Sequence, residues 1–150
     1  MHEATAPRRA LLFALGDRHY AIRVSAVGGV AECGPIRRVP GAPSAVVGLA
    51  EWRGNVLTVL DLAHLLDRPP GDAQPSLVRL APPLQQAALL LTAYLSVAEV
   101  VADFDAPGAE GSEPDSDEFM TRFEHDGGEV RLIDPVRLFR RLDTRLRGRT

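Results

Sequence analysis

The chain has 150 residues, of which 45% are hydrophobic, and a formal net charge of −3. This length fits one domain or two very small ones, and a folded chain of this size hides about 70% of the surface that its unfolded form exposes. The small negative charge excludes a molecule that attracts nucleic acid as a whole. The single cysteine, Cys33, excludes an internal disulfide and a cysteine metal cluster, and it suits a reducing compartment.

The first residues contain two arginines before an apolar run, as a secretory signal does. The run from Ala10 to Leu15 is shorter than the apolar core of a signal peptide, and the polar residues GDRH follow it directly. No stretch approaches the roughly 20 apolar residues of a membrane span. We therefore expect residues 1–9 to be flexible and the protein to be cytoplasmic.

The first half of the chain predicts four strands and one short helix. Runs rich in β-branched and aromatic residues alternate there with Gly, Pro and Asp. The predicted strands are 11–15, 20–24, 46–52 and 55–60. Val24, Val27 and Val30 are spaced by three residues and predict a helical turn between the second and third strands. Asp61 is a suitable cap for a short helix that follows it.

The second half begins after a turn-rich connector, 67–75, and predicts more strands. These strands are 77–80, 87–91, 119–123 and 129–133, and the apolar stretch 94–101 fits either a helix or a strand. Segment 103–118 is acidic and rich in Pro, Gly and Ser, which predicts a surface loop.

The end of the chain predicts its clearest helix. Asp134 is a good N-cap, and Pro135 suits the first helical position because its missing N–H costs nothing there. Gly148 suits the end of the helix. The predicted apolar stripe consists of Val136, Phe139, Leu142 and Leu146.

One pattern occurs twice, about half a chain apart. The stretch GNVLTVLDLAHLL from Gly54 and the stretch GGEVRLIDPVRLF from Gly127 each run from a glycine through a strand to an aspartate at the same spacing. Two half-sized β units, each ending in a capped helical segment, would explain this repeat.

Two stretches of the first half resemble a known family. LLFALGDRHYAIRVSAVGGV resembles the start F-x-L-G-x-x-x-Y-A-I, and VPGAPSAVVGLAEWRGNVLTVLDL resembles P-x-x-P-x-x-x-x-G-x-x-x-x-R-G-x-x-x-x-V-x-D-L. Arg53 and Gly54 fall on the Arg-Gly pair of that pattern. The pattern resembles that of the CheW-like coupling proteins of bacterial chemosensory systems. The resemblance covers roughly residues 10–142, and its second half depends mainly on strand order and on the LIDPVRLF ending.

The resemblance implies a mostly β fold of two five-stranded SH3-like barrels with short helices and a C-terminal helix. We expect a single domain over 1–150, with one barrel over roughly 10–66, the second over roughly 76–134 and the helix over roughly 135–147. The family has no catalysis and no cofactor. It links the cytoplasmic tips of methyl-accepting chemoreceptors to the regulatory domain of a CheA-type histidine kinase, which implies recruitment to membrane-associated receptor arrays without membrane insertion or nucleic-acid binding.

The resemblance also provides candidate contact residues for each partner. The receptor-groove candidates are Val24, Val27, Val30, Arg53, Tyr94 and Val97. The kinase-interface candidates are Trp52, Val46 and Gly48. The valines read equally well as plain core, whereas the family reading makes some of them an apolar floor for a receptor helical hairpin. We expect Arg53 to hold backbone carbonyls with its planar guanidinium, helped by Glu51 or Glu32.

Several positions depart from the family pattern. Gly29 replaces a glutamate that would face Arg53, and Trp52 replaces a smaller apolar residue. In the second half, Ala88, Thr92 and Tyr94 stand in place of a glycine, an aspartate and a valine. These departures leave two readings open: an adaptor for an unusual receptor, or a paralogue that binds only one partner in a motility or polar-localisation system.

Arginines near the C-terminus allow a reading from another class, a β-barrel module that binds nucleic acid. They are Arg137, Arg140, Arg141, Arg145, Arg147 and Arg149. A solvated helix face with cations near its C-terminus explains them as well, and no aromatic residues interleave with them as single-strand binding would favour. The sequence also lacks a nucleophile elbow, a phosphate-binding glycine loop and metal-ligand spacing of His or Cys, so it predicts neither an enzyme nor a metal centre.

Overall fold

The computed structural model describes residues 7–101 and 119–147, with side chains as far as residue 142. In these ranges the chain forms ten strands, two α-helices and one short 3₁₀ turn. The strands are β1 (Arg8–Leu15), β2 (Arg18–Arg23), β3 (Val27–Glu32), β4 (Val46–Trp52), β5 (Asn55–Asp61), β6 (Ser76–Leu80), β7 (Ala87–Leu91), β8 (Ser96–Val100), β9 (Met120–His125) and β10 (Gly128–Ile133). The helices are α1 (Leu62–Leu65) and α2 (Pro135–Arg147), and the 3₁₀ turn is Val24–Ala26.

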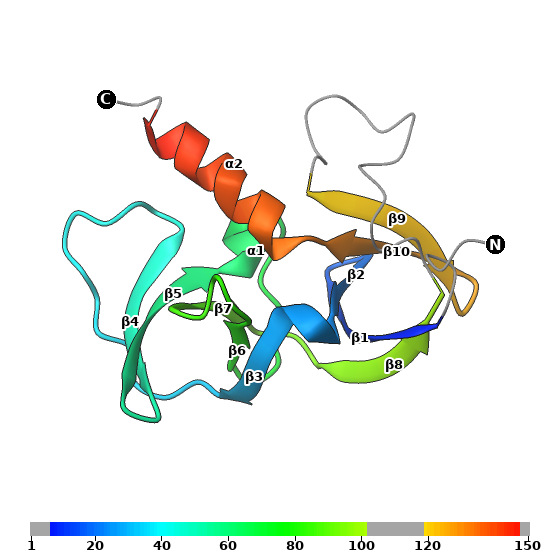
Figure 1. The fold of residues 1–150 in the computed structure, drawn as a ribbon, viewed down its shortest axis with the longest axis horizontal. Helices are drawn as coiled ribbons and strands as arrows, with labels where there is room; N and C mark the ends of the chain where they lie inside the picture. The colour runs from blue at the N-terminus through cyan, green and yellow to red at the C-terminus, as the bar shows by residue number, and fades with distance from the viewer. Residues whose placement is uncertain (1–6, 102–118, 148–150) are drawn as a thin grey trace. The chain divides into compact units, whose positions relative to one another are not determined.

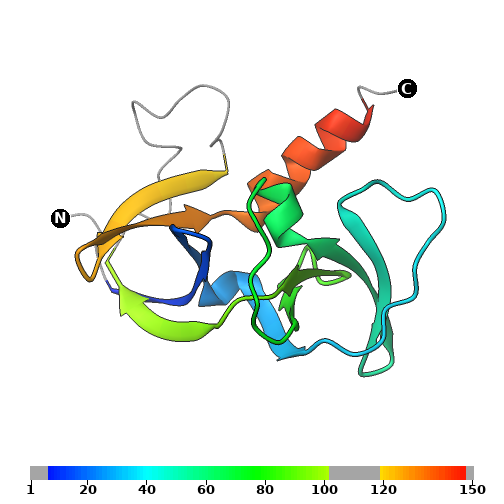
Figure 2. The same ribbon diagram turned by 180° about the vertical axis from the view of Figure 1, so that it is seen from behind.

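The strands form two five-stranded sheets, which confirms the mostly β fold (Figure 1). The first sheet has the order β8-β1-β2-β10-β9, and the second has the order β3-β6-β7-β5-β4. Each sheet contains one parallel pair, β10 with β2 and β5 with β7, among antiparallel neighbours. In both views the strands of the first sheet curve around a common interior (Figures 1 and 2).

The division of the chain into units differs from the expected barrels at roughly 10–66 and 76–134. Among the described residues, one compact unit consists of 7–12, 18–24, 96–101 and 119–147, and the other consists of 13–17 and 25–95. The units are not sequential because β1 pairs with β8 and β2 pairs with β10, so the first hairpin joins strands from the end of the chain. Turn and periodicity signals are local, and they do not reveal such long-range pairing.

The predicted helical turn over Val24, Val27 and Val30 is only partly correct. Val24 lies in the 3₁₀ turn, but Val27 and Val30 belong to strand β3. The register of β3 against β6 shifts between Val27 and Gly29. A bulge inserts one residue into a strand, so it converts the usual spacing of two into a spacing of three that imitates a helix.

Each unit has its own apolar core, built from alternate residues of its strands. In the first unit the cluster consists of Ala10, Ala21, Val100, Val130 and Leu132, with Leu12 and Phe123 packed against it. In the second unit it consists of Ala50, Leu57, Val59, Leu77 and Ala88, with Cys33, Ile36, Val47, Trp52 and Leu90 packed against it. Fully burying one Val or Leu side chain contributes about 1.5–3 kcal/mol, so the period-two alternation decides which register each strand adopts.

The repeat in the sequence corresponds to a repeated hairpin. Trp52 pairs with Asn55 across the turn between β4 and β5, and His125 pairs with Gly128 across the turn between β9 and β10. Both turns have two residues with positive φ: 47° and 83° at Arg53 and Gly54, and 51° and 79° at Asp126 and Gly127. Positive φ at both positions defines the type I′ turn, whose twist matches that of the flanking strands.

Each repeated hairpin ends at an aspartate that caps a helix, as the sequence predicts. The Asp61 carboxylate accepts a hydrogen bond from the backbone N–H of His64 at 3.3 Å, at the start of α1. The Asp134 carboxylate accepts from the backbone N–H groups of Val136 at 3.0 Å and Arg137 at 3.4 Å, at the start of α2. These bonds satisfy donors that the first turn of a helix leaves without a partner.

Helix α2 buries a different residue from those expected. Leu138 is 2% exposed, whereas Val136, Phe139 and Leu142 of the predicted stripe are only partly buried. The side chain of Leu146, the predicted stop at Gly148 and the predicted loop at 103–118 lie outside the described residues. The stretch 94–101, which fits either type of element, contains strand β8.

Arg68 fixes the turn between β1 and β2 within the second unit. Its Nη2 donates to the carbonyl oxygen of Leu15 at 3.2 Å and to the carboxylate of Asp17 at 2.6 Å. A β-carbon at Gly16, where φ is 64°, would lie 2.7 Å from that same Nη2. Glycine therefore serves both the positive φ and the close approach of the guanidinium.

Gly48 is the position where strand β4 is most tightly covered. The N–H of Arg37 donates to the carbonyl of Leu49 at 2.8 Å, and the N–H of Leu49 donates to the carbonyl of Arg37 at 2.8 Å. This pairing presses the segment before β4 onto Gly48, whose φ is 154°. A β-carbon there would collide with the Arg37 carbonyl oxygen and would lie 2.8 Å from Cγ2 of Ile36.

We predict that Gly48→Ala lowers the free energy of unfolding by roughly 2–4 kcal/mol, because backbone strain and overpacking add. Urea denaturation monitored by circular dichroism measures this loss. Gly34→Ala is the matched control, since a β-carbon at Gly34 meets no atom within 4 Å. Equal stability of the two variants would contradict the close packing at Gly48.

Candidate partner-binding surfaces

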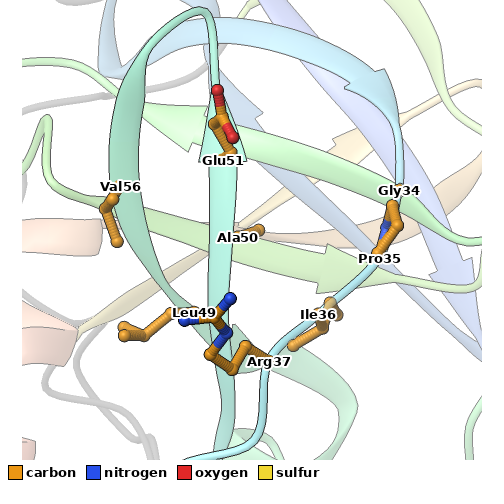
Figure 3. Close-up of a pocket in the computed structure, with 8 residues that line it drawn as sticks. All are labelled: Gly34, Pro35, Ile36, Arg37, Leu49, Ala50, Glu51 and Val56. Carbon is orange, nitrogen blue, oxygen red and sulfur yellow. The ribbon is translucent and has the colours of Figure 1, made fainter.

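A hollow lies beside the β4–β5 hairpin in the second unit (Figure 3). Its volume is about 740 Å³, and it is lined by the segment that precedes β4 and by the two hairpin strands. The lining residues are Gly34, Pro35, Ile36, Arg37, Leu49, Ala50, Glu51 and Val56. The hollow forms because the segment is hydrogen-bonded to β4 at Arg37 and Leu49, and separates from the strand before Glu51.

The lining is apolar with one cation and one anion. Val56 is 63% exposed, and Arg37 and Glu51 are exposed as well. An exposed apolar side chain between opposite charges suits the edge of a protein interface better than a closed small-molecule site. Ile36, Leu49 and Val56 are not among the candidates that the sequence provides. Pro35, Pro40 and Pro43 are the sequence signal that this segment is a loop.

Two departures from the family pattern meet in the structure. A β-carbon at Gly29 would lie 2.9 Å from Cζ2 and 3.6 Å from Cη2 of Trp52, so the edge of the indole lies directly over Gly29. Trp52 is partly buried and packs against the core cluster of the second unit. The absence of a side chain at Gly29 therefore provides the space that the large side chain at Trp52 occupies.

Arg53 does not hold backbone carbonyls or a carboxylate, which corrects the sequence-based expectation. It is exposed, and its guanidinium makes no hydrogen bond or ion pair with any of the described residues, Glu51 and Glu32 among them. The reason is its place at the tip of a two-residue turn, where φ is 47° and the carbonyls of the flanking strands are already used in the hairpin ladder.

The receptor-groove candidates are distributed over both units. Val24 and Val97 belong to the first unit, and Val27, Val30, Arg53 and Tyr94 belong to the second. Val30, Tyr94 and Val97 are 46%, 83% and 50% exposed, so these apolar side chains are available for contact, while Val24 and Val27 are partly buried. Their role toward a receptor stays a prediction.

The kinase-interface candidates lie on one strand, β4. Val46 and Trp52 are partly buried, and Gly48 is buried. Gly48 offers no side chain, so any influence it has on a partner acts through the placement of Leu49 and Arg37 above it. The hollow beside β4 adds exposed apolar surface next to these candidates.

Ala88 and Thr92, two further departures, have structural roles. Ala88 is fully buried in the core of the second unit. The Thr92 hydroxyl accepts from the N–H of Gly71 at 2.9 Å, and its carbonyl accepts from the N–H of Ala73 at 3.1 Å. Thr92 thus holds the turn-rich connector against the end of β7.

The described residues show no catalytic arrangement. Ser44 Oγ lies 3.2 Å from Nε2 of His64, but the Asp61 carboxylate bonds to the backbone of His64 and the pair is exposed. Burial raises the pKa of the Cys33 thiol, which keeps it protonated at neutral pH and a poor nucleophile. No group of three or more His, Cys, Asp or Glu residues in the described ranges could hold a metal ion.

None of the helices in the described residues is both long and apolar enough to span a membrane.

The described residues thus form two curved five-stranded sheets with exposed apolar side chains. The model of the CheW-like domain family matches residues 9–143, so the chain belongs to this family. The structure is similar to the scaffolding protein TtCheW from Thermoanaerobacter tengcongensis, with a TM-score of 0.70, 17% identity, and coverage of 85% of this chain and 89% of that one. At this identity the likeness shows the fold alone.

The sequence is also 29% identical over 65 residues to a probable chemotaxis protein CheW of Rhizobium etli. The matched stretch is 43% of this chain and 42% of that relative, so it spans less than half the length of the relative.

We predict that Arg53→Lys leaves the free energy of unfolding within about 0.5 kcal/mol of the wild-type value, as for other exposed side chains. Arg53→Asn should raise it by about 0.5 kcal/mol, because asparagine tolerates positive φ better than arginine. Arg53→Val should lower it, since a β-branched residue is strained in this conformation. Urea denaturation of the three variants checks the order. A loss above about 1 kcal/mol in Arg53→Lys would reveal a guanidinium hydrogen bond instead.

Proposed function

We propose that this protein is a non-catalytic chemosensory adaptor that couples chemoreceptor tips to a CheA-type histidine kinase. The observation that carries the proposal is the match of the CheW-like domain across residues 9–143. An adaptor acts through surfaces, and the described residues offer exposed apolar side chains without a catalytic arrangement. On this proposal the protein is recruited to membrane-associated receptor arrays through its partners.

The proposal assigns receptor contacts to exposed candidates in each unit separately: Val97 in the first unit, and Val30, Tyr94 and Arg53 in the second. Val30, Tyr94 and Val97 are 46%, 83% and 50% exposed, so they have apolar area to gain from burial against an amphipathic helix. Tyr94, at 83% exposed, combines a large apolar ring with a hydroxyl and suits the centre of a contact.

The kinase-facing surface of the proposal is the β4–β5 hairpin. Val46 and Trp52 are candidates from the sequence, and the hollow adds Leu49 and Val56 on the same two strands. Both partners are proposed because the resemblance provides a different set of candidates for each, and the two sets adjoin where Trp52 precedes Arg53. The departures Gly29, Ala88, Thr92 and Tyr94 leave two alternatives open: an adaptor for an unusual receptor, or a paralogue that binds only one partner in a motility or polar-localisation system.

The described arginines of α2 do not favour the nucleic-acid alternative. Arg137 is 3.6 Å from the Asp134 carboxylate, and the Arg141 guanidinium lies 5.6 Å from the centre of the Phe119 ring. These arginines have partners within their own unit, which lowers their availability for phosphates.

We expect the purified protein to bind a CheA-type regulatory domain with a dissociation constant of about 1–10 µM, a binding free energy of about −7 to −8 kcal/mol. Isothermal titration calorimetry with the regulatory domain and with a receptor cytoplasmic fragment measures both partners. Binding of only one partner favours the paralogue, and binding of neither overturns the proposal. Duplex DNA titrated at about 50 and 200 mM salt tests the remaining alternative, because phosphate binding weakens steeply over this range.

We predict that Val97→Asp weakens binding of the receptor fragment at least about tenfold, since a carboxylate would be buried in an apolar contact. Binding of the regulatory domain should stay unchanged. Val39→Asp is the matched control, because Val39 is a similarly exposed valine, at 42%, outside the candidate set. Equal loss in the two variants, or in neither, would remove Val97 from the receptor surface.

A further inference from the structure

The β4–β5 hairpin is anchored by one aromatic side chain. Strands β3 and β4 are the two ends of the second sheet, and no hydrogen-bonded ladder joins them in the described residues. The indole of Trp52, from β4, crosses to β3 and covers Gly29 there. This contact therefore joins two strands that the backbone ladder leaves apart.

The contact depends on the size of both residues. With a β-carbon at Gly29 only 2.9 Å from the indole, any larger residue at this position must displace the ring. Glycine within a strand costs about 0.5–1 kcal/mol relative to alanine, so a glycine without positive φ needs a packing reason. The ring above Gly29 provides that reason.

Trp52 is also the residue that closes the turn at Arg53 and Gly54. It pairs with Asn55 directly before the turn, and its ring packs against the core cluster of the second unit. Arg53 and Gly54 are exposed, and within the described residues the Arg53 side chain makes no hydrogen bond or ion pair that would fix the turn. The packed side chain of Trp52, directly before the turn, therefore sets the direction in which the Arg53–Gly54 turn points.

We propose that Trp52 and Gly29 form a size-matched pair that positions the Arg53–Gly54 turn for the adaptor's partner. Trp52 acts as a positioning residue. Its ring also covers the part of β3 where a side chain at position 29 would lie. This assignment rests on the proposed adaptor function for its partner, while the pair itself is a property of the free protein.

Trp52 is the only tryptophan of the chain, so its fluorescence reports on the pair directly. Gly29→Val should shift the emission to longer wavelength and make the indole more accessible to acrylamide, with the circular dichroism spectrum retained. Backbone amides of the turn, measured by hydrogen exchange, should exchange faster. Gly34→Val is the matched control, because a β-carbon at Gly34 meets nothing within 4 Å. Unchanged fluorescence and exchange in Gly29→Val would overturn the pair.

A double-variant cycle separates pairing from general damage. Gly29→Val and Trp52→Leu should each lower the melting temperature by about 3–6 °C, whereas the double variant should melt above both, because valine fills the space that the ring leaves. Additive losses would contradict a size-matched pair.

The partner readout uses the regulatory domain and the receptor fragment in calorimetry. Gly29→Val should weaken binding of at least one of them about tenfold, and the double variant should recover part of that loss. Suppose that the wild-type protein and Gly29→Val bind a partner equally well although the indole of the variant is displaced. In that case the positioning role is wrong, and the adaptor function stands. If wild type binds neither partner, the adaptor function fails, and the fluorescence, exchange and melting data still decide the pair.

Discussion

The two-residue turn with positive φ at both positions is the constraint on which each sheet depends. Because the turn admits no extra residue, it fixes which residues of β4 and β5, and of β9 and β10, face each other. A slip of one residue would move every apolar side chain of a strand to the opposite face. The second strand of each hairpin then pairs in parallel with a strand from elsewhere in the chain, so the register set at the turn extends across the sheet.

The proposed partner surfaces follow from where the ladders end. An edge strand has neighbours on one side only, and its side chains and loops remain available for contact. In the second unit, the segment around Arg37 covers the edge strand β4 at Gly48 and Leu49. At the other end of β4, the Trp52 ring lies over Gly29 of β3. Beside this edge the hollow remains open, lined by exposed Val56 as well as by Ala50 and Ile36, which also take part in the core.

Local features of the fold could be predicted from the sequence. The caps at Asp61 and Asp134, and the strands that flank Arg53, depend on residues close in sequence, and the structure confirms them. The pairing of β2 with β10 could not be predicted from local signals, because it joins residues more than a hundred positions apart. The bulge in β3 also concealed a strand, since it changed the spacing of its valines.

The candidate site was predicted less well than the fold. Val30, Tyr94 and Val97, which the resemblance offers as groove candidates, are exposed in the structure, and their role toward a receptor stays a prediction. The hollow could not be predicted, since it arises from a loop that lies against a strand. The hydrogen bonds expected of Arg53 within the protein are not found in the described residues, because a resemblance marks a position and not its contacts. In the sequence, Gly29 and Trp52 are two separate departures from the family pattern. Only the structure shows that these two residues are in contact.

The tight covering of Gly48 has a consequence for how this surface can change over evolutionary time. The bonds between Arg37 and Leu49 that exclude a side chain at Gly48 also hold the segment from which the hollow opens. Selection for folding alone therefore preserves the hollow, whatever its occupant. Val56, at 63% exposed, can then vary with little effect on the backbone, so new partner preferences can arise at this surface while the scaffold beneath it is inherited unchanged.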